Sequence, residues 1–182
     1  AHASVNNYLA DKNREIGKAG FNRDAMMLPG DEFMHWADSL KDVQMAYLNA
    51  YEKTNPDNSF WKTEEANILY GWAQNYQMYP VYFEYFNKGK QVVLPDNFNE
   101  YKNDLDVNNP EYLGSGAFTS YVSAVVQEYA ANKSNEPGNK AADYNMMVLE
   151  LAGDVIKNQQ VMDKYLTQTI MGRLQYTDVS AM

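Results

Sequence analysis

Apolar residues recur at three- and four-residue steps along most of this chain, and that helical period constrains its fold more than any other feature of the sequence. The longest such stripe follows Asp31 and consists of Phe33, Trp36, Leu40, Val43, Tyr47 and Tyr51. Similar stripes recur downstream, and joints rich in Pro, Gly and Asn separate them. The pattern predicts an all-α fold of six to eight helices packed as antiparallel hairpins.

Start and stop signals predict the ends of the first two helices. A modest helix covers residues 1–19 and ends near Gly20. Asp31, which follows the breakers Pro29 and Gly30, stands where the N-cap of the long second helix belongs. The turn formers of TNPDNS end that helix.

The third helix is predicted to start near Ser59 or Thr63. Glu64 and Glu65 then fall in its first turn, where the helix dipole favours acidic side chains. Its apolar stripe consists of Ile68, Leu69, Trp72, Ala73 and Tyr76. Pro80 lacks a backbone N–H and its ring clashes with the preceding turn, so we expect a break or a kink there.

The stretch LDVNNPEYLGSGAF, residues 105–118, is predicted to be a joint between helices. Asn109 before Pro110 has the form of an N-cap followed by proline at the first helical position, and Ser115 marks a second helix start. Three stripes follow: Phe118, Tyr121, Val122, Val125, Val126 and Tyr129; then Tyr144, Met147, Val148, Leu151 and Val155; then Met162, Tyr165, Leu166, Ile170 and Leu174. The polar segment ANKSNEPGN separates the first two, and KNQQ, a short turn or a kink, separates the last two.

The same stretch does not fit a calcium-binding loop. Counted from Asp106, Pro110 occupies the fifth position, where an oxygen ligand is required. Glu111 replaces the glycine of the sixth position, and Ala117 replaces the glutamate of the twelfth. The residues therefore predict a capped joint and no metal site.

Charge and cysteine content exclude several classes of function. The net charge of −9 disfavours binding to nucleic acid or to an anionic membrane surface. With no cysteine the chain holds no disulfide, no thiolate metal site and no CxxC redox pair. No apolar stretch of membrane-spanning length is present, so we predict no membrane insertion by this chain.

No residue pattern indicates catalysis or cofactor binding. His35 shares a helical face with Asp31 and Asp38, but a lone helical histidine is far more often a surface residue than a ligand. Glu64 and Glu65 point about 100° apart on a helix, so they cannot form a catalytic carboxylate pair alone. We predict no catalytic, cofactor-binding or metal-ligating residue. A hydrolase would need two acids about 5–9 Å apart in a cleft.

The aromatic run YGWAQNYQMYPVYFEYF, residues 70–86, is the most unusual feature of the composition. Aromatic side chains with Asn and Gln between them are suited to stacking sugars or holding a peptide. The alternative is that these residues build the core and pack against a neighbouring domain. The candidate binding surface consists of Trp72, Tyr76, Tyr79 and Tyr82.

The segment VVLPDNFNEYKNDLDVNNPEYLGSGAFTSYVSAVVQEY resembles the helical segment of membrane-anchored TlpA/ResA-like thiol-disulfide oxidoreductases of Gram-negative anaerobes. The matching pattern is hydrophobic-Asp-hydrophobic-Asn-Asn-Pro-Glu at residues 105–111, with Phe118 as the aromatic before a helix. The preceding residues that fit its lead-in are Leu94, Pro95, Phe98 and Tyr101. In that family the redox chemistry belongs to a CxxC motif on a thioredoxin domain, so no catalytic residue carries over to this cysteine-free chain.

The resemblance implies a non-catalytic helical accessory and interaction module of a periplasmic thiol-disulfide oxidoreductase. We expect a single helical domain over residues 1–182, with residues 1–27 as a peripheral helix and the thioredoxin-like domain elsewhere in a longer protein. The expected partners are that linked domain and its client protein, in the periplasm or cell envelope, and no cofactor is implied for this chain. The alternative is a cell-surface glycan- or peptide-binding helical protein.

Overall fold

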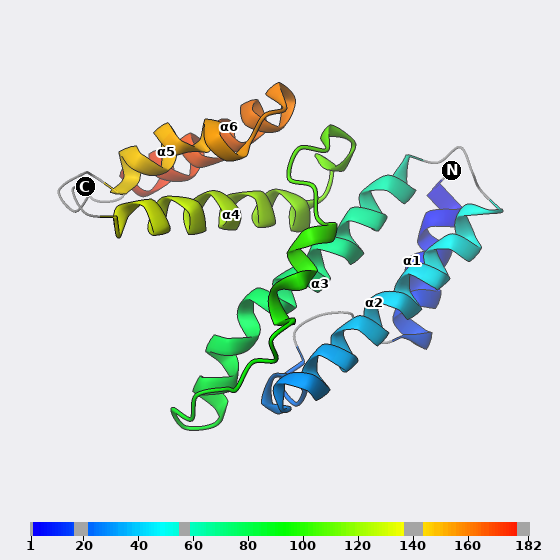
Figure 1. The fold of residues 1–182 in the computed structure, drawn as a ribbon. Coiled ribbons are helices and arrows are strands. Elements are labelled where there is room, and N and C mark those ends of the chain that lie inside the picture. The colour runs from blue at the N-terminus through cyan, green and yellow to red at the C-terminus, as the bar shows by residue number, and fades with distance from the viewer. Residues whose placement is uncertain (1, 17–21, 55–58, 137–143, 178–182) are drawn as a thin grey trace. The chain divides into compact units, whose positions relative to one another are not determined.

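The computed structural model of the protein describes residues 2–16, 22–54, 59–136 and 144–177, with side chains from residue 5 to residue 172. This part of the chain contains six α-helices, three short 3₁₀ segments and no strand (Figure 1). The all-α prediction is therefore confirmed. The chain divides into two compact units, Ala1–Leu105 and Asp106–Met182. A single domain over residues 1–182 stays a prediction.

The first unit is built on an antiparallel helix pair. Its elements are α1 (His2–Glu15), the 3₁₀ segment η1 (Ala25–Met27), α2 (Gly30–Glu52), α3 (Phe60–Phe86) and the 3₁₀ segment η2 (Phe98–Asp104). α2 and α3 run side by side in opposite directions, and α1 packs beside α2 (Figure 1). The predicted end of the first helix near Gly20 lies outside the described residues.

The buried face of α2 differs from the predicted stripe. Its buried residues are Gly30, Phe33, Ala37, Gln44 and Leu48, whereas Val43 is 53% exposed. The prediction was wrong for Val43, because α2 turns the neighbouring Gln44 toward the interior instead. The prediction of Asp31 as N-cap was also wrong: Pro29 occupies that position, and Asp31 lies in the first turn.

α3 continues through Pro80, so of the predicted break or kink the break is wrong, and a kink stays a prediction. Proline removes one backbone hydrogen bond, but Tyr79 and Phe83 on either side of it are both buried, and that packing holds the helix together. The helix closes where Gly89 adopts φ +84° and its N–H donates to the carbonyl of Glu84 at 2.8 Å.

Aromatic residues dominate the core of the first unit. Phe33 of α2 stacks on Tyr79 of α3 with ring centroids 3.8 Å apart. The Tyr79 hydroxyl donates to the carbonyl of Leu28 at 2.7 Å, which ties the segment after η1 to α3. At the other end, Tyr8 of α1 is fully buried and contacts the rings of Tyr47, Tyr51, Phe60 and Trp61.

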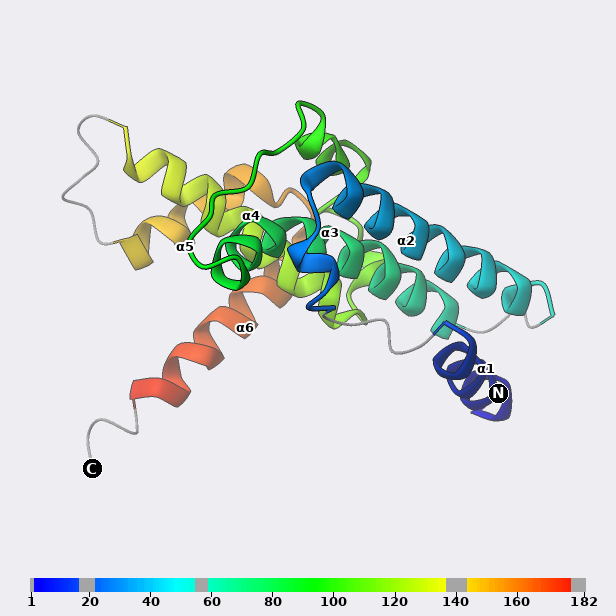
Figure 2. The same ribbon diagram turned by 90° about the horizontal axis from the view of Figure 1, so that it is seen from below.

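The second unit is a three-helix arrangement preceded by a short turn. Its elements are the 3₁₀ segment η3 (Pro110–Tyr112), α4 (Gly116–Ser134), α5 (Tyr144–Val155) and α6 (Gln159–Thr177). α5 lies beside α4, and α6 diverges from both toward its C-terminal end (Figure 2). The core consists mainly of Phe118, Tyr121, Val122, Val126, Met147, Val148, Val161 and Tyr165. Two residues of the predicted stripes, Tyr144 and Ile170, are 43% and 49% exposed instead.

The predicted joint at residues 105–118 is confirmed. The Asn109 side chain accepts a hydrogen bond from the Glu111 N–H at 3.0 Å and caps η3. The Ser115 hydroxyl accepts from the Phe118 N–H at 3.1 Å and caps α4. Each cap satisfies a backbone donor that a helix start would otherwise leave free.

Asn108 has a further role that its position in the sequence did not indicate. Its side-chain oxygen accepts from the backbone N–H groups of Lys157 and Asn158, and its amide donates to the carbonyl of Val155 at 3.4 Å. One side chain thereby fixes the joint between α5 and α6. Among the described residues, no helix is both long enough and apolar enough to cross a bilayer.

Candidate functional site

The four residues of the predicted binding surface lie on α3, and three of them are in the core. Trp72, Tyr76 and Tyr79 are 6%, 2% and 0% exposed, so their rings offer little area to a ligand. Tyr82 is half-buried and stacks on Phe86 with ring centroids 5.8 Å apart. The aromatic run thus serves mainly to build the first unit.

Asp38 of α2 satisfies the polar groups of two of these buried rings. Its Oδ1 accepts from the indole N–H of Trp72 at 2.8 Å and from the hydroxyl of Tyr76 at 2.9 Å. Burial raises the pKa of Tyr76, and the hydrogen bond to Asp38 raises it further. The Lys41 ammonium lies 4.1 Å from the centroid of the Trp72 ring, within range of a cation–π contact.

A cleft of about 300 Å³ opens beside Asp38. We call it the acidic cleft, because four carboxylates line it together with one lysine: Asp38, Asp42, Glu100, Asp104 and Lys41. Its apolar lining comes from Met34, Trp72, Tyr76, Phe98 and Tyr101. Two of the four predicted surface residues, Trp72 and Tyr76, therefore border this cleft.

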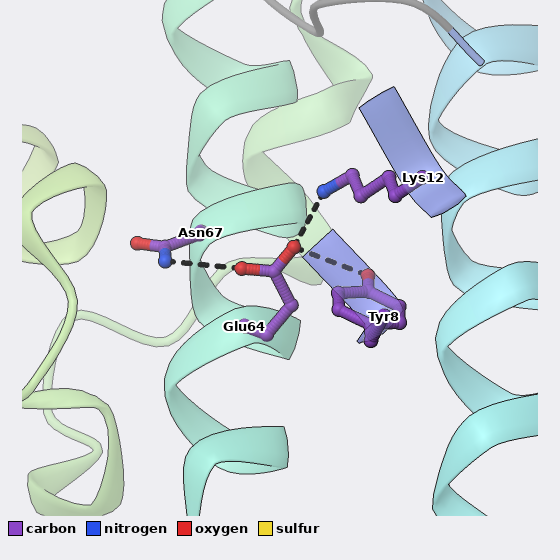
Figure 3. Close-up of polar contacts among 4 residues, drawn as sticks. All are labelled: Tyr8, Lys12, Glu64 and Asn67. Atoms are coloured by element: carbon purple, nitrogen blue, oxygen red, sulfur yellow. Dashed lines mark hydrogen bonds and ion pairs between the residues drawn. The ribbon is translucent and has the colours of Figure 1, made fainter. Parts of the chain in front are cut away.

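Glu64 forms a buried polar centre between α1 and α3, shown in Figure 3. The residue is 5% exposed. Its Oε1 accepts from the Tyr8 hydroxyl at 3.1 Å and from the Lys12 ammonium, and its Oε2 accepts from the Asn67 amide at 3.3 Å. We call these four residues the Glu64 cluster.

The Glu64 cluster corrects the predicted role of this acid. α3 has no acidic residue in its first turn, so the assignment of Glu64 and Glu65 to that turn was wrong. Glu64 instead pairs with Lys12 across helices, and Glu65 forms an ion pair with Lys62 at 3.0 Å. Burial raises the pKa of Tyr8, and the neighbouring Glu64 carboxylate raises it further.

A second hollow of about 270 Å³ lies between α2 and α3, next to the Glu64 cluster. We call it the amide pocket, because four carboxamides line it: Gln44, Asn67, Gln74 and Asn75. Its remaining lining comes from Lys12, Lys41 and an apolar wall of Ala37, Leu40, Ile68, Gly71, Trp72 and Met78. Unlike the acidic cleft, it has no carboxylate in its lining.

Gln44 is the unusual residue of the amide pocket. It is only 5% exposed, yet its carboxamide makes no hydrogen bond to any described residue. The described residues contain no fully buried side-chain nitrogen or oxygen that lacks a partner. The polar atoms of Gln44 therefore face the open space of the pocket. Asn75 likewise has no hydrogen-bond partner among the described residues.

The other residues singled out from the sequence do not assemble a site. His35 is exposed on α2, and Asp38 on its face is bound to Trp72 and Tyr76. Within the residues that the structure describes, no three His, Asp or Glu side chains gather as metal ligands would. Sequence reasoning missed Gln44. The pattern that could have indicated its burial is its spacing: Gln44 lies seven residues after Ala37 and four before Leu48, on the same buried face of the helix.

The chain has no match among protein-family models, curated proteins or solved structures.

Proposed function

We propose that this chain is a non-catalytic helical binding module. The observation that carries the proposal is the amide pocket, where Gln44 is nine-tenths buried and makes no hydrogen bond within the described part of the chain. Because the polar atoms of Gln44 face the open pocket, a ligand that takes up their hydrogen bonds replaces bonds to water, and each such exchange adds a modest amount of free energy to binding. Carboxamides form hydrogen bonds but are neither nucleophiles nor general acids, which supports binding without turnover.

A ligand panel tests this proposal by titration calorimetry on the whole chain. The panel contains neutral, acidic and amino sugars, short peptides and small amines. We expect at least one class to bind, with nuclear magnetic resonance (NMR) spectra of the mixture showing the ligand unchanged after prolonged incubation. Chemical conversion of a bound ligand, or no binding across the panel, would contradict the proposal.

The family resemblance supports a more specific context for the same module. We infer an accessory segment of a periplasmic or cell-envelope thiol-disulfide oxidoreductase, whose linked thioredoxin-like domain carries the chemistry and whose client the module helps to bind. The gene gives a direct test. We expect its reading frame to encode a CxxC-bearing domain and an export signal; a frame without them contradicts this context and leaves the binding proposal standing.

A second candidate is a cell-surface protein that binds a glycan or a peptide. The two neighbouring hollows favour it, because the amide pocket and the acidic cleft share Trp72 and Lys41 in their linings and together offer a longer site than either alone. A stand-alone gene product that binds an oligosaccharide or a peptide would favour this candidate over the accessory module.

A further inference from the structure

The hydrogen-bonding groups of the amide pocket specify a ligand that both donates and accepts. The carboxamides of Gln44 and Asn75, which bond to no other residue that the structure describes, each carry an acceptor oxygen and a donor NH₂ group. A hydroxyl group is also both donor and acceptor, so adjacent hydroxyls can satisfy the two sides of a carboxamide together. A purely apolar molecule would leave Gln44 unpaired and gain nothing from it.

The charges around the pocket favour a neutral ligand. Lys12 is already paired with Glu64, and Lys41 lies over the Trp72 ring with Asp42 at 3.9 Å. An anion would therefore meet no unpaired lysine, in a chain whose net charge is −9. A cation would meet no carboxylate in the lining of the pocket.

The size and the apolar wall of the pocket suit one sugar ring. A volume of about 270 Å³ lies just below the usual range for drug-sized ligands, which favours a small ligand. Leu40, Ile68 and Met78 make part of the lining apolar, so the pocket offers both apolar area and hydrogen-bonding groups. A pyranose ring combines an apolar C–H face with a rim of hydroxyls and so matches both parts.

We propose that the amide pocket binds one neutral pyranose ring, free or at the end of a glycan, through hydrogen bonds to Gln44 and Asn75. This inference rests on the proposed binding function and names the ligand class for its site.

Side-chain amide NMR signals report directly on the two residues involved. The ¹⁵N-labelled chain is titrated with methyl glycosides of glucose, galactose, mannose and N-acetylglucosamine. We expect at least one of them to shift the NH₂ signals of Gln44 and Asn75. Methyl glucuronide and methyl glucosaminide are the anionic and cationic counterparts of methyl glucoside. Each should bind at least about tenfold more weakly than the neutral glycoside that binds best. Matched disaccharides show whether a chain end binds better than a free ring.

Two variants localise the binding without depending on a loss of folding. Gln44→Leu replaces an unpartnered amide by an apolar group of similar size, so binding should fall about tenfold or more while the melting temperature holds or rises. Gly71→Leu adds a side chain at a residue that lines the pocket, and a Cβ at Gly71 meets no atom within 4 Å, so the new side chain has room to occupy the site. Gly153→Leu is the matched control: Gly153 lies in a helix of the other unit and has the same open surroundings.

The outcomes separate this inference from the binding function beneath it. If only acidic sugars, amines or peptides bind, or if a neutral sugar binds equally well to Gln44→Leu and Gly71→Leu, the pyranose assignment is wrong and the binding module stands. If nothing in the wider panel binds, both proposals fail.

Discussion

Two glycines of the first unit illustrate how the same residue type serves opposite purposes. A Cβ at Gly30 would lie 2.8 Å from the carbonyl oxygen of Val93 and 2.7 Å from Cδ of Pro95. A Cβ at Gly71, in the middle of α3, would meet nothing within 4 Å. Gly30 is thus required for close packing, whereas Gly71 leaves space beside the amide pocket and costs helix stability.

Alanine at these two positions should change stability in opposite directions. Gly71→Ala should stabilise the protein by about 0.5–1 kcal/mol, because alanine favours a helix interior over glycine. Gly30→Ala should destabilise it by about 1–3 kcal/mol, because a backbone oxygen must shift to admit the methyl group. Urea denaturation of the two variants measures both values. Equal effects of the same sign would contradict the local packing around Gly30.

The ion pair in the Glu64 cluster should be strongly coupled. Lys12→Met leaves a buried carboxylate without its cation and should cost about 3–5 kcal/mol, as should Glu64→Gln, which leaves the ammonium unpaired. The double variant should cost much less than the sum of the two single variants. Lys62→Met, which breaks the exposed pair with Glu65, is the control and should cost no more than about 1 kcal/mol. Additive effects at Lys12 and Glu64 would show that the pair does not hold α1.

At the scale of elements, side-chain caps set the joints of the second unit. The side chains of Asn108, Asn109 and Ser115 each accept backbone hydrogen bonds. The distance along the sequence between donor and acceptor differs among them. Asn109 and Ser115 bind donors two and three residues ahead of them. Asn108 instead binds N–H groups about 50 residues away at the joint of α5 and α6.

Alanine variants of the two neighbouring asparagines should separate local from long-range effects. Asn108→Ala should cost about 1–3 kcal/mol, because it leaves the N–H groups of Lys157 and Asn158 without their acceptor. Asn109→Ala removes one exposed cap and should cost about 1 kcal/mol or less. Amide hydrogen exchange at Lys157 and Asn158 should accelerate only in Asn108→Ala. Faster exchange there in Asn109→Ala would contradict the assignment.

The sequence allowed local features of these elements to be predicted, while features set by partners distant in sequence were not. The caps at Asn109 and Ser115 were predictable, because a cap depends on residues two or three positions away. The rotation of α2 that exposes Val43 and buries Gln44 depends on how α2 packs against other helices. The burial of Glu64 depends on Lys12 and Tyr8, more than 50 residues earlier. The amide pocket, made by Gln44 and Asn75 on separate helices, was missed for the same reason.

At the scale of the molecule, buried tyrosines limit stability in alkaline solution. Burial raises the pKa of Tyr79 to about 12, with a smaller contribution from Asp31, and raises the pKa of Tyr121 to about 12 with a contribution from Glu128. Tyr8 and Tyr76 shift in the same direction. Below pH 10, the ordinary pKa of tyrosine, these phenols are protonated in both states and pH has no effect through them. Above pH 10 the tyrosines of the unfolded chain lose their protons first, so the unfolded chain binds fewer protons than the folded chain.

The free energy of unfolding should therefore fall as the pH rises from about 10 toward 12. Denaturant titrations at several alkaline pH values measure the slope. Tyr121→Phe removes one of these phenols, and its stability should fall less steeply over the same interval. A slope that is unchanged in this variant would contradict the role of Tyr121, and constant stability across the interval would contradict the burial of all four phenols.

The division into two compact units also has a spectroscopic consequence. All three tryptophans, Trp36, Trp61 and Trp72, belong to the unit Ala1–Leu105. Indole emission is therefore a built-in reporter of that half alone, whereas far-ultraviolet ellipticity records helices of both. Superimposed melting curves from the two signals would identify one cooperative folding unit, and separated curves would identify two, without any label or truncation.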